Sequence, residues 1–176
     1  MKWSKSKKAL EKLFAESVKK HVQFYVTQYG PGQSYTMARG WVTWDGQEIA
    51  NFSSVEHMTE TYQMSAQIRE ANHTMDFRDA EQHDGYNLAY NEARRIVQKK
   101  GVFSRDQFQD AVKTYLSLSI EEALNSDNPI IKALSMFDRR LGQRRLIKLQ
   151  IGDSVPALVK LFYRLRCQAD ELVETH

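Results

Sequence analysis

The alternation of hydrophobic and polar positions divides the chain into a helix, a short region of strands and a long helical region. Apolar residues recur at helical spacing from Leu10 to Val18, and Ser4 is the predicted N-cap of that helix. From His21 the period changes to two, which is typical of a strand. After Phe52 the helical spacing returns. We therefore expect an α+β fold with an N-terminal helix, a three-stranded antiparallel sheet and a mainly helical C-terminal half.

The segment of period two predicts three strands. The first covers residues 22–27 and is followed by a Gly30-Pro31-Gly32 turn. The second covers residues 35–44 and the third covers residues 47–52. Asp45-Gly46 between them is typical of a two-residue hairpin, because a type I′ turn needs positive φ at both central positions. We expect helices to cover one aromatic core face of this sheet, formed by Tyr35, Trp41, Trp44 and Phe52.

Capping signals mark the starts of the later helices. Residues 53–56 form a capping box that opens a helix to about residue 72. The stripe expected to be buried on this helix consists of Val55, Met58, Tyr62 and Ala66. Further helix starts are predicted at Ser104-x-x-Gln107, Ser119-x-x-Glu122, Asn128-Pro129 and Asp153-Ser154-x-Pro156.

A polar interruption at residues 73–84 is the best candidate for a linker or mobile loop, and a helix is predicted to follow over residues 85–100. The interruption separates an α-β-β-β-α unit, residues 1–72, from a helical region, residues 73–176. Because 176 residues are enough to bury a single core, we expect the two parts to pack together as one compact domain.

Composition excludes several classes of protein. With 8 Gly and 3 Pro the chain is neither fibrous nor of low complexity. Its single cysteine, Cys167, excludes an internal disulfide and fits a reducing compartment. No apolar run approaches the ~20 residues that a membrane-spanning helix needs. We therefore expect a cytoplasmic protein that does not associate with a membrane.

The net charge of +3 conceals two basic segments. Residues 1–20 carry seven Lys and two Glu, and residues 138–150 carry five Lys or Arg and one Asp. Residues 21–137 between them hold ten basic and fifteen acidic side chains, so the body of the chain is mildly acidic. Two basic segments on such a body can attract an anionic partner or can dock within the chain.

The second basic segment is the candidate binding site. Its basic side chains are Arg139, Arg140, Arg144, Arg145 and Lys148. If one helix continues through Gly142, then Arg140, Arg144 and Lys148 lie four residues apart and form a ridge that can hold phosphate or carboxylate. If the helix ends at Gly142, then Arg139 and Arg140 lie in its last turn and complement the helix dipole. Asp138 can pair with either arginine in both cases.

Metal and nucleophilic chemistry have only scattered candidates. His57 and Glu60 lie three apart on one predicted helical face, and the polar loop holds Asp76, Asp79, His83 and Asp84. Neither set has the spacing of a known metal site, so no metal ligand is assigned. Cys167 is interpreted as a buried, unreactive thiol. The sequence contains no phosphate-binding glycine loop, nucleophile elbow or dinucleotide fingerprint, and no cofactor is expected.

An RNA-binding role rests on two weaker patterns. The element order over residues 5–72 resembles the double-stranded-RNA-binding domain, and residues 39–44 resemble an RNA-stacking strand. Residues 45–70 oppose this interpretation, because they hold five acidic side chains and a single basic one and would repel phosphate. An aromatic core face explains the aromatic residues of the sheet better.

Four segments resemble a family of uncharacterised conserved bacterial proteins. They are Trp3-Ser4-Lys5-x-Lys7-Lys8, Ser117-x-Ser119-Ile120-Glu121-Glu122, Asp138-Arg139-Arg140-Leu141-Gly142-x-Arg144 and Phe162-Tyr163-x-Leu165-Arg166. The resemblance implies a bacterial cytoplasmic protein and carries over no catalytic residue.

Together these observations predict a non-catalytic protein that binds an acidic protein partner or an anionic ligand through the arginine-rich segment. The alternatives are a nucleic-acid-associated protein and a metal-dependent enzyme that uses the loop at residues 73–84. Neither the identity of the ligand nor the oligomeric state can be derived from the sequence.

Overall fold

The computed structural model describes residues 2–27, 37–73 and 78–172. The predicted order of elements is confirmed, with an N-terminal helix, a three-stranded antiparallel sheet and a mainly helical C-terminal half. Helix α1 (Trp3–Leu13) begins one residue before the predicted cap, and its N-cap is Lys2, which makes no side-chain capping bond. The prediction that Ser4 caps this helix was therefore wrong. A short α2 (Glu16–Lys19) follows.

The sheet has the order β1-β2-β3, formed by β1 (Val22–Val26), β2 (Arg39–Trp44) and β3 (Gln47–Ser53). Asp45 and Gly46 join the last two strands with φ of 49° and 80°, as the predicted type I′ turn requires. The predicted second strand began at residue 35, but β2 begins at Arg39. Tyr35 and the Gly30-Pro31-Gly32 turn lie outside the described residues.

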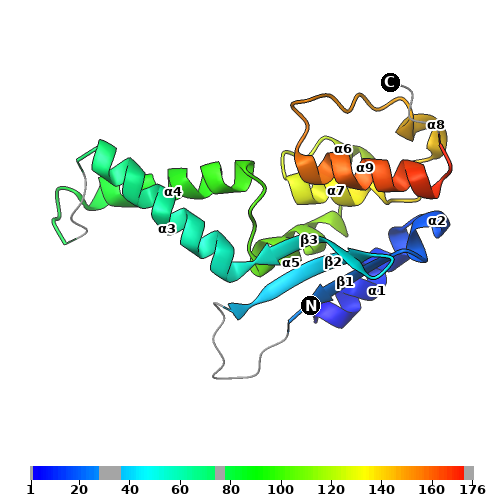
Figure 1. Ribbon diagram of the computed structural model, residues 1–176, viewed down its shortest axis with the longest axis horizontal. Helices are drawn as coiled ribbons and strands as arrows, with labels where there is room; N and C mark the ends of the chain where they lie inside the picture. Colours follow the sequence, from blue (N-terminus) through cyan, green and yellow to red (C-terminus); the bar gives the residue numbers. More distant parts are fainter. Residues whose placement is uncertain (1, 28–36, 74–77, 173–176) are drawn as a thin grey trace.

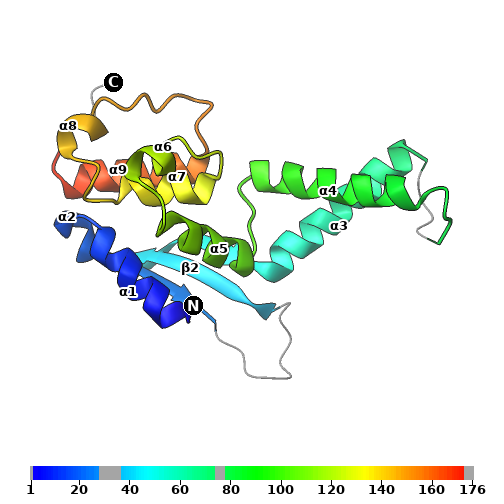
Figure 2. The ribbon, with the colours of Figure 1, turned by 180° about the vertical axis from the view of Figure 1, so that it is seen from behind.

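One face of the sheet is packed into the core and the other is not covered by a described helix. Figures 1 and 2 show α1 and α5 (Arg105–Tyr115) on the same face. On this face the α5 residue Phe108 stacks on both Phe24 and Phe52. Gly40 lies beneath Phe108, where a Cβ atom would approach the Phe108 Cδ1 atom to 2.9 Å. The close approach of sheet and helix thus depends on a residue without a side chain.

The aromatic residues of the sheet do not share one face as predicted. Trp44 and Phe52 are buried. Trp41 lies on the opposite face, because β2 alternates between the two faces, and its ring stacks on that of Tyr25 at a centroid distance of 5.0 Å. The expectation that Trp41 belongs to the core face was therefore wrong.

Helices α3 (Ser54–Ala71) and α4 (His83–Lys99) pack against each other and extend together away from the sheet (Figures 1 and 2). The Ser53 side chain accepts a hydrogen bond from the Glu56 backbone and so caps α3 as predicted. Because α4 begins at His83, the end of the predicted loop is helical. Residues 74–77 lie outside the described residues.

The stripe predicted for α3 was wrong, because the helix buries His57, Thr61 and Ser65 against α4 and leaves Val55 and Tyr62 exposed. The facing side of α4 presents small and β-branched side chains, namely Ala89, Ala93 and Val97. Small side chains let two helices approach closely, and the short polar residues of α3 fit this space. The Thr61 hydroxyl donates to the His57 carbonyl at 2.7 Å, so this buried hydroxyl has a hydrogen-bond partner.

Four more helices complete the chain: α6 (Ile120–Leu124), α7 (Pro129–Met136), α8 (Gln143–Leu146) and α9 (Ala157–Ala169). The capping boxes of α5 and α6 and the Asn128 cap with Pro129 at the first position of α7 are confirmed. The prediction that Asp153 and Ser154 open the last helix was wrong, because the N-cap of α9 is Pro156 and no side chain caps it.

The core is continuous between the sheet and the helical half. Phe14 packs against Phe24 and Phe137, and Phe137 stacks on Phe162 of α9 at a centroid distance of 4.4 Å. Helix α5 also contacts both the sheet and α7. The predicted boundary at residue 72, between an α-β-β-β-α unit and a helical region, stays a prediction.

Candidate functional site

The arginine-rich segment is not one helix, and neither predicted arrangement occurs. Helix α7 ends at Met136 before the first arginine, and Gly142 is the N-cap of the short α8. Arg140, Arg144 and Lys148 therefore form no helical ridge. Arg139 and Arg140 lie in a turn and not in the last turn of a helix. Gly142 lies outside the helices, so no helix continues through this glycine.

Asp138 organises this turn. Its side chain is fully buried and accepts hydrogen bonds from the Arg140 backbone at 2.7 Å and from the Arg140 Nη2 at 2.7 Å. The Tyr115 hydroxyl donates to the same carboxylate, and Arg166 of α9 donates to the Asp138 carbonyl at 3.3 Å. The Arg140 Nη1 also donates to the Leu118 carbonyl at 2.9 Å. Arg140 thus holds the turn against α5, and its role is structural.

The protonation states of this cluster follow from its geometry. Burial, with the Asp138 charge next in importance, raises the pKa of the Tyr115 hydroxyl above its usual range. The hydrogen bonds to Asp138 raise the pKa of the Arg140 guanidinium. Tyr115 therefore remains a donor and Arg140 remains a cation over the whole physiological pH range.

The remaining basic residues of the segment lie on the surface. Arg145 pairs with Glu121 of α6 at 2.9 Å, and both side chains are largely exposed. Arg139, Arg144 and Lys148 are exposed, and their side chains form no hydrogen bond or ion pair with the described residues. Of the five predicted site residues, these three are available to a partner.

The structure joins the two basic segments that lie far apart in the sequence. The backbone N–H of Arg139 donates to the Leu13 carbonyl at 2.8 Å, and the N–H of Ala15 donates to the Phe137 carbonyl at 2.9 Å. These bonds form an antiparallel bridge between Phe14 and Asp138. The end of α1 therefore lies directly beside the arginine turn.

Helix α1 carries a row of free cations to this junction. Lys5, Lys8 and Lys12 are three and four residues apart, so they lie on one face of the helix. All three are exposed, and none forms an ion pair with the described residues. We call these three lysines together with Arg139, Arg144 and Lys148 the basic face. The sequence analysis did not place these lysines near residue 139, because no local pattern reveals that proximity.

The His and Asp residues considered for metal binding do not converge. The His57 side chain is buried between α3 and α4, where burial, with the nearby Arg94 next, lowers the pKa of its imidazole. Asp76 lies outside the described residues. Asp79 caps the turn before α4 by accepting from the Glu81 backbone at 2.9 Å. Among the residues that the structure describes, no group of three or more His, Cys, Asp or Glu side chains is arranged to hold a metal ion.

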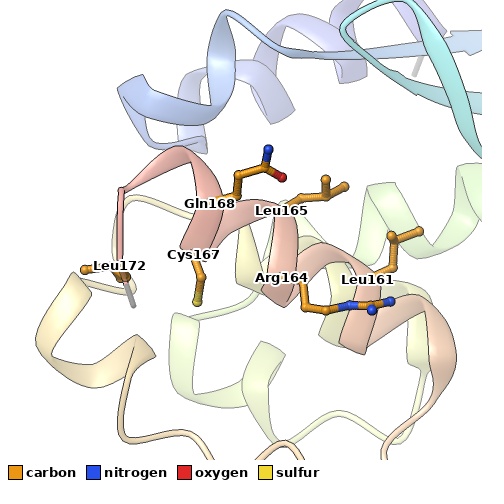
Figure 3. Close-up of a pocket in the computed structure, with 6 residues that line it drawn as sticks. All are labelled: Leu161, Arg164, Leu165, Cys167, Gln168 and Leu172. Atoms are coloured by element: carbon orange, nitrogen blue, oxygen red, sulfur yellow. The ribbon is translucent and has the colours of Figure 1, made fainter. Parts of the chain in front are cut away.

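Cys167 shows the geometry of a structural thiol. It is 2% exposed on α9. Figure 3 shows Cys167 and Arg164 leaving the helix on one side and Leu165 and Gln168 on the other, so these side chains do not converge on a reacting centre. The described residues that line this hollow include no carboxylate and no imidazole; they are Leu161, Arg164, Leu165, Cys167, Gln168 and Leu172.

The uncovered face of the sheet carries a stack of aromatic and cationic groups. The Arg39 guanidinium lies 4.8 Å from the Trp41 ring centre, and the Lys7 ammonium lies 5.0 Å from that of Tyr25. Tyr25 and Trp41 stack on each other between them. The protein's own groups therefore occupy these ring faces, which leaves no open platform on which a nucleic-acid base could stack.

These features define a protein with an α+β fold, a sheet packed on one face and a basic surface built from two distant segments. The chain belongs to the SF0329 protein family, whose model matches residues 2–167. The predicted membership of an uncharacterised family is thereby confirmed. Comparison with curated proteins and with solved structures gives no match. Over the described ranges, none of the helices combines the length and the apolar character that crossing a bilayer requires.

Proposed function

We propose that this protein is a non-catalytic binding protein of the bacterial cytoplasm that recognises an acidic surface of a protein partner through its basic face. The observation that carries the proposal is the bridge between Phe14 and Asp138, which sets the end of α1, with its lysine row, beside the segment that carries the cations of residues 139–148. Six exposed cations that form no ion pair with the described residues, on an otherwise acidic body, favour association with a negative surface.

An acidic protein suits this surface better than nucleic acid does. The middle of the chain is acidic, and a polymer of phosphates running past the basic face would meet that charge. The stacked rings of Tyr25 and Trp41 already cover each other, so base stacking has no support. A compact carboxylate cluster on a protein can engage the basic face without reaching the acidic body.

Binding of labelled polyglutamate at several salt concentrations tests the proposal. The variants Lys5→Ala/Lys8→Ala/Lys12→Ala and Arg139→Ala/Arg144→Ala/Lys148→Ala should each weaken binding about tenfold at low salt and reduce its salt dependence, because each removes three cations. Lys113→Ala, which removes a cation already paired with Asp110, should leave binding unchanged.

Two outcomes would contradict the proposal. If only one of the two triple variants affects binding, the two basic segments do not form a common site. If a duplex RNA binds more tightly than polyglutamate at equal ionic strength, with the same loss in both variants, the nucleic-acid alternative is favoured.

A further inference from the structure

Strand β3 presents an open edge. The N–H of Thr27 donates to the Arg39 carbonyl, so the backbone groups of Arg39 point toward β1. Because strand residues alternate, the backbone groups of Trp41 point the same way, and those of Asn51, its partner in β3, point away from β2. Outside the ladder with β2, no described hydrogen bond uses the backbone N–H or C=O of Asn51. An unpaired edge of this kind is a template for another strand.

A cleft runs along this edge. It has a volume of about 980 Å³, and four consecutive residues of β3, numbers 49–52, line it. Successive side chains of a strand point to opposite faces, so a cleft that touches four in a row follows the backbone edge and not one face of the sheet. The C-terminal end of α4 and the N-terminal ends of α7 and α9 contribute to the lining of this cleft. Figure 1 shows these helices above β3.

The cleft walls combine apolar contact with positive charge. Phe103, Pro129, Leu158 and Leu161 supply apolar surface opposite the strand. At the rim, α4 and the residue that follows it contribute Arg95, Lys99 and Lys100, which are exposed and form no ion pair among the described residues. Asp127 is the one acidic side chain that the described lining includes. The cleft therefore carries excess positive charge.

We propose that this cleft binds an extended acidic segment of a partner protein, which adds to the sheet as a fourth strand beside β3. The outward N–H and C=O of the edge supply main-chain hydrogen bonds, and the apolar wall receives alternate side chains of the segment. The cations from α4 meet its carboxylates. This surface lies apart from the basic face, so the inference goes beyond the proposed function and does not rest on it.

A short synthetic peptide of alternating valine and glutamate is the probe, and fluorescence anisotropy measures its binding to the full chain. One control peptide carries N-methyl groups on alternate residues, which block ladder hydrogen bonds while keeping the side chains. A second replaces glutamate with lysine. The unmodified peptide should bind, and neither control should. Equal binding of the N-methylated peptide, or no binding of the unmodified one, would overturn the proposal.

Two variants of one residue isolate the strand edge. Asn51→Ala and Asn51→Pro both remove the hydrogen bond that the Asn51 side chain accepts from Arg39, but only proline also removes the outward N–H. Proline should weaken peptide binding about threefold to tenfold relative to alanine, the range for one hydrogen bond. Equal affinities of the two variants would show that the peptide does not pair with the edge.

Hydrogen exchange on the unsubstituted protein provides a test that does not depend on the folding of a variant. Bound peptide should slow exchange of the Asn51 amide and leave the inward-facing Phe52 amide as it was. An Asn51 amide that exchanges equally fast with and without saturating peptide would refute strand addition.

Charge variants separate this cleft from the basic face. Arg95→Ala/Lys99→Ala/Lys100→Ala should weaken the valine–glutamate peptide about tenfold and flatten its salt dependence. The matched triple variant Lys5→Ala/Lys8→Ala/Lys12→Ala should not change it. If instead the Lys5→Ala/Lys8→Ala/Lys12→Ala variant weakened binding and the cleft variant did not, the peptide would bind to the basic face. The proposal for the cleft would then be wrong.

Discussion

Replacing Asp138 with asparagine tests whether the arginine turn is a structural junction. The variant keeps the shape of the side chain and removes its charge. The carboxylate is fully buried and binds Arg140 through Nε at 3.0 Å and Nη2 at 2.7 Å. Oδ2 accepts both of these bonds, and Oδ1 accepts from the Arg140 backbone N–H at 2.7 Å. An amide has only one oxygen, so its NH₂ group would set a donor against a donor of Arg140 in either orientation.

The expected cost follows from these contacts. A hydrogen bond to a charged group contributes about 1.5–3 kcal/mol, and removing one partner of a fully buried ion pair costs about 3–5 kcal/mol. The Arg140 side chain is 32% exposed, so water can solvate part of the guanidinium once its partner is neutral. We therefore expect Asp138→Asn to lower the free energy of unfolding by about 2–3 kcal/mol, toward the lower end of these ranges.

Urea denaturation at neutral pH measures this loss, provided that the slope against denaturant is unchanged. The matched control is Glu121→Gln, which breaks the exposed pair with Arg145 and should change stability by less than about 0.5 kcal/mol. Equal stability of Asp138→Asn and the parent protein would refute the assignment of Asp138 and Arg140 to structure. The arginine would then be free for a ligand.

Three further variants test other parts of the fold. The lowered pKa of His57 means that the unfolded state binds its proton first, so stability should fall as pH drops below 6.5. His57→Gln should flatten that slope in urea titrations, and an unchanged slope would show that the buried imidazole does not cause it. Gly40→Ala should cost about 1–3 kcal/mol in thermal or urea unfolding, because its Cβ collides with Phe108; no loss would show that the ring yields freely. Asn128→Ala should cost about 1 kcal/mol by removing the cap of α7, and a neutral result would show that Pro129 alone starts the helix.

Most features encoded by neighbouring residues were predictable from the sequence, although the predicted caps at Ser4 and at Asp153-Ser154 do not occur. The caps at Ser53, Ser104, Ser119 and Asn128 depend on a side chain and a backbone group at most three residues away, and all four occur. The Asp45-Gly46 hairpin is equally local.

Features that depend on distant partners were not predictable. Which stripe of α3 is buried is decided by the small residues of α4, and the fate of Arg140 is decided by Tyr115 and Leu118. The β3 cleft requires knowledge of the strand order and of where α4 ends and α9 begins. No spacing in the sequence carries that information.

The bridge between Phe14 and Asp138 also constrains how the chain can be assembled. It closes a loop that contains the sheet and the helices α2 to α7. During synthesis the end of α1 leaves the ribosome long before the turn that receives it, so this junction forms only after most of the chain has emerged. Closing so long a loop costs conformational entropy, whereas a helix forms from contacts between near neighbours and has no such cost. The junction is therefore expected among the late steps of folding. A nascent chain that stops short of residue 137 would therefore leave the Leu13 carbonyl and the Ala15 N–H without their partners.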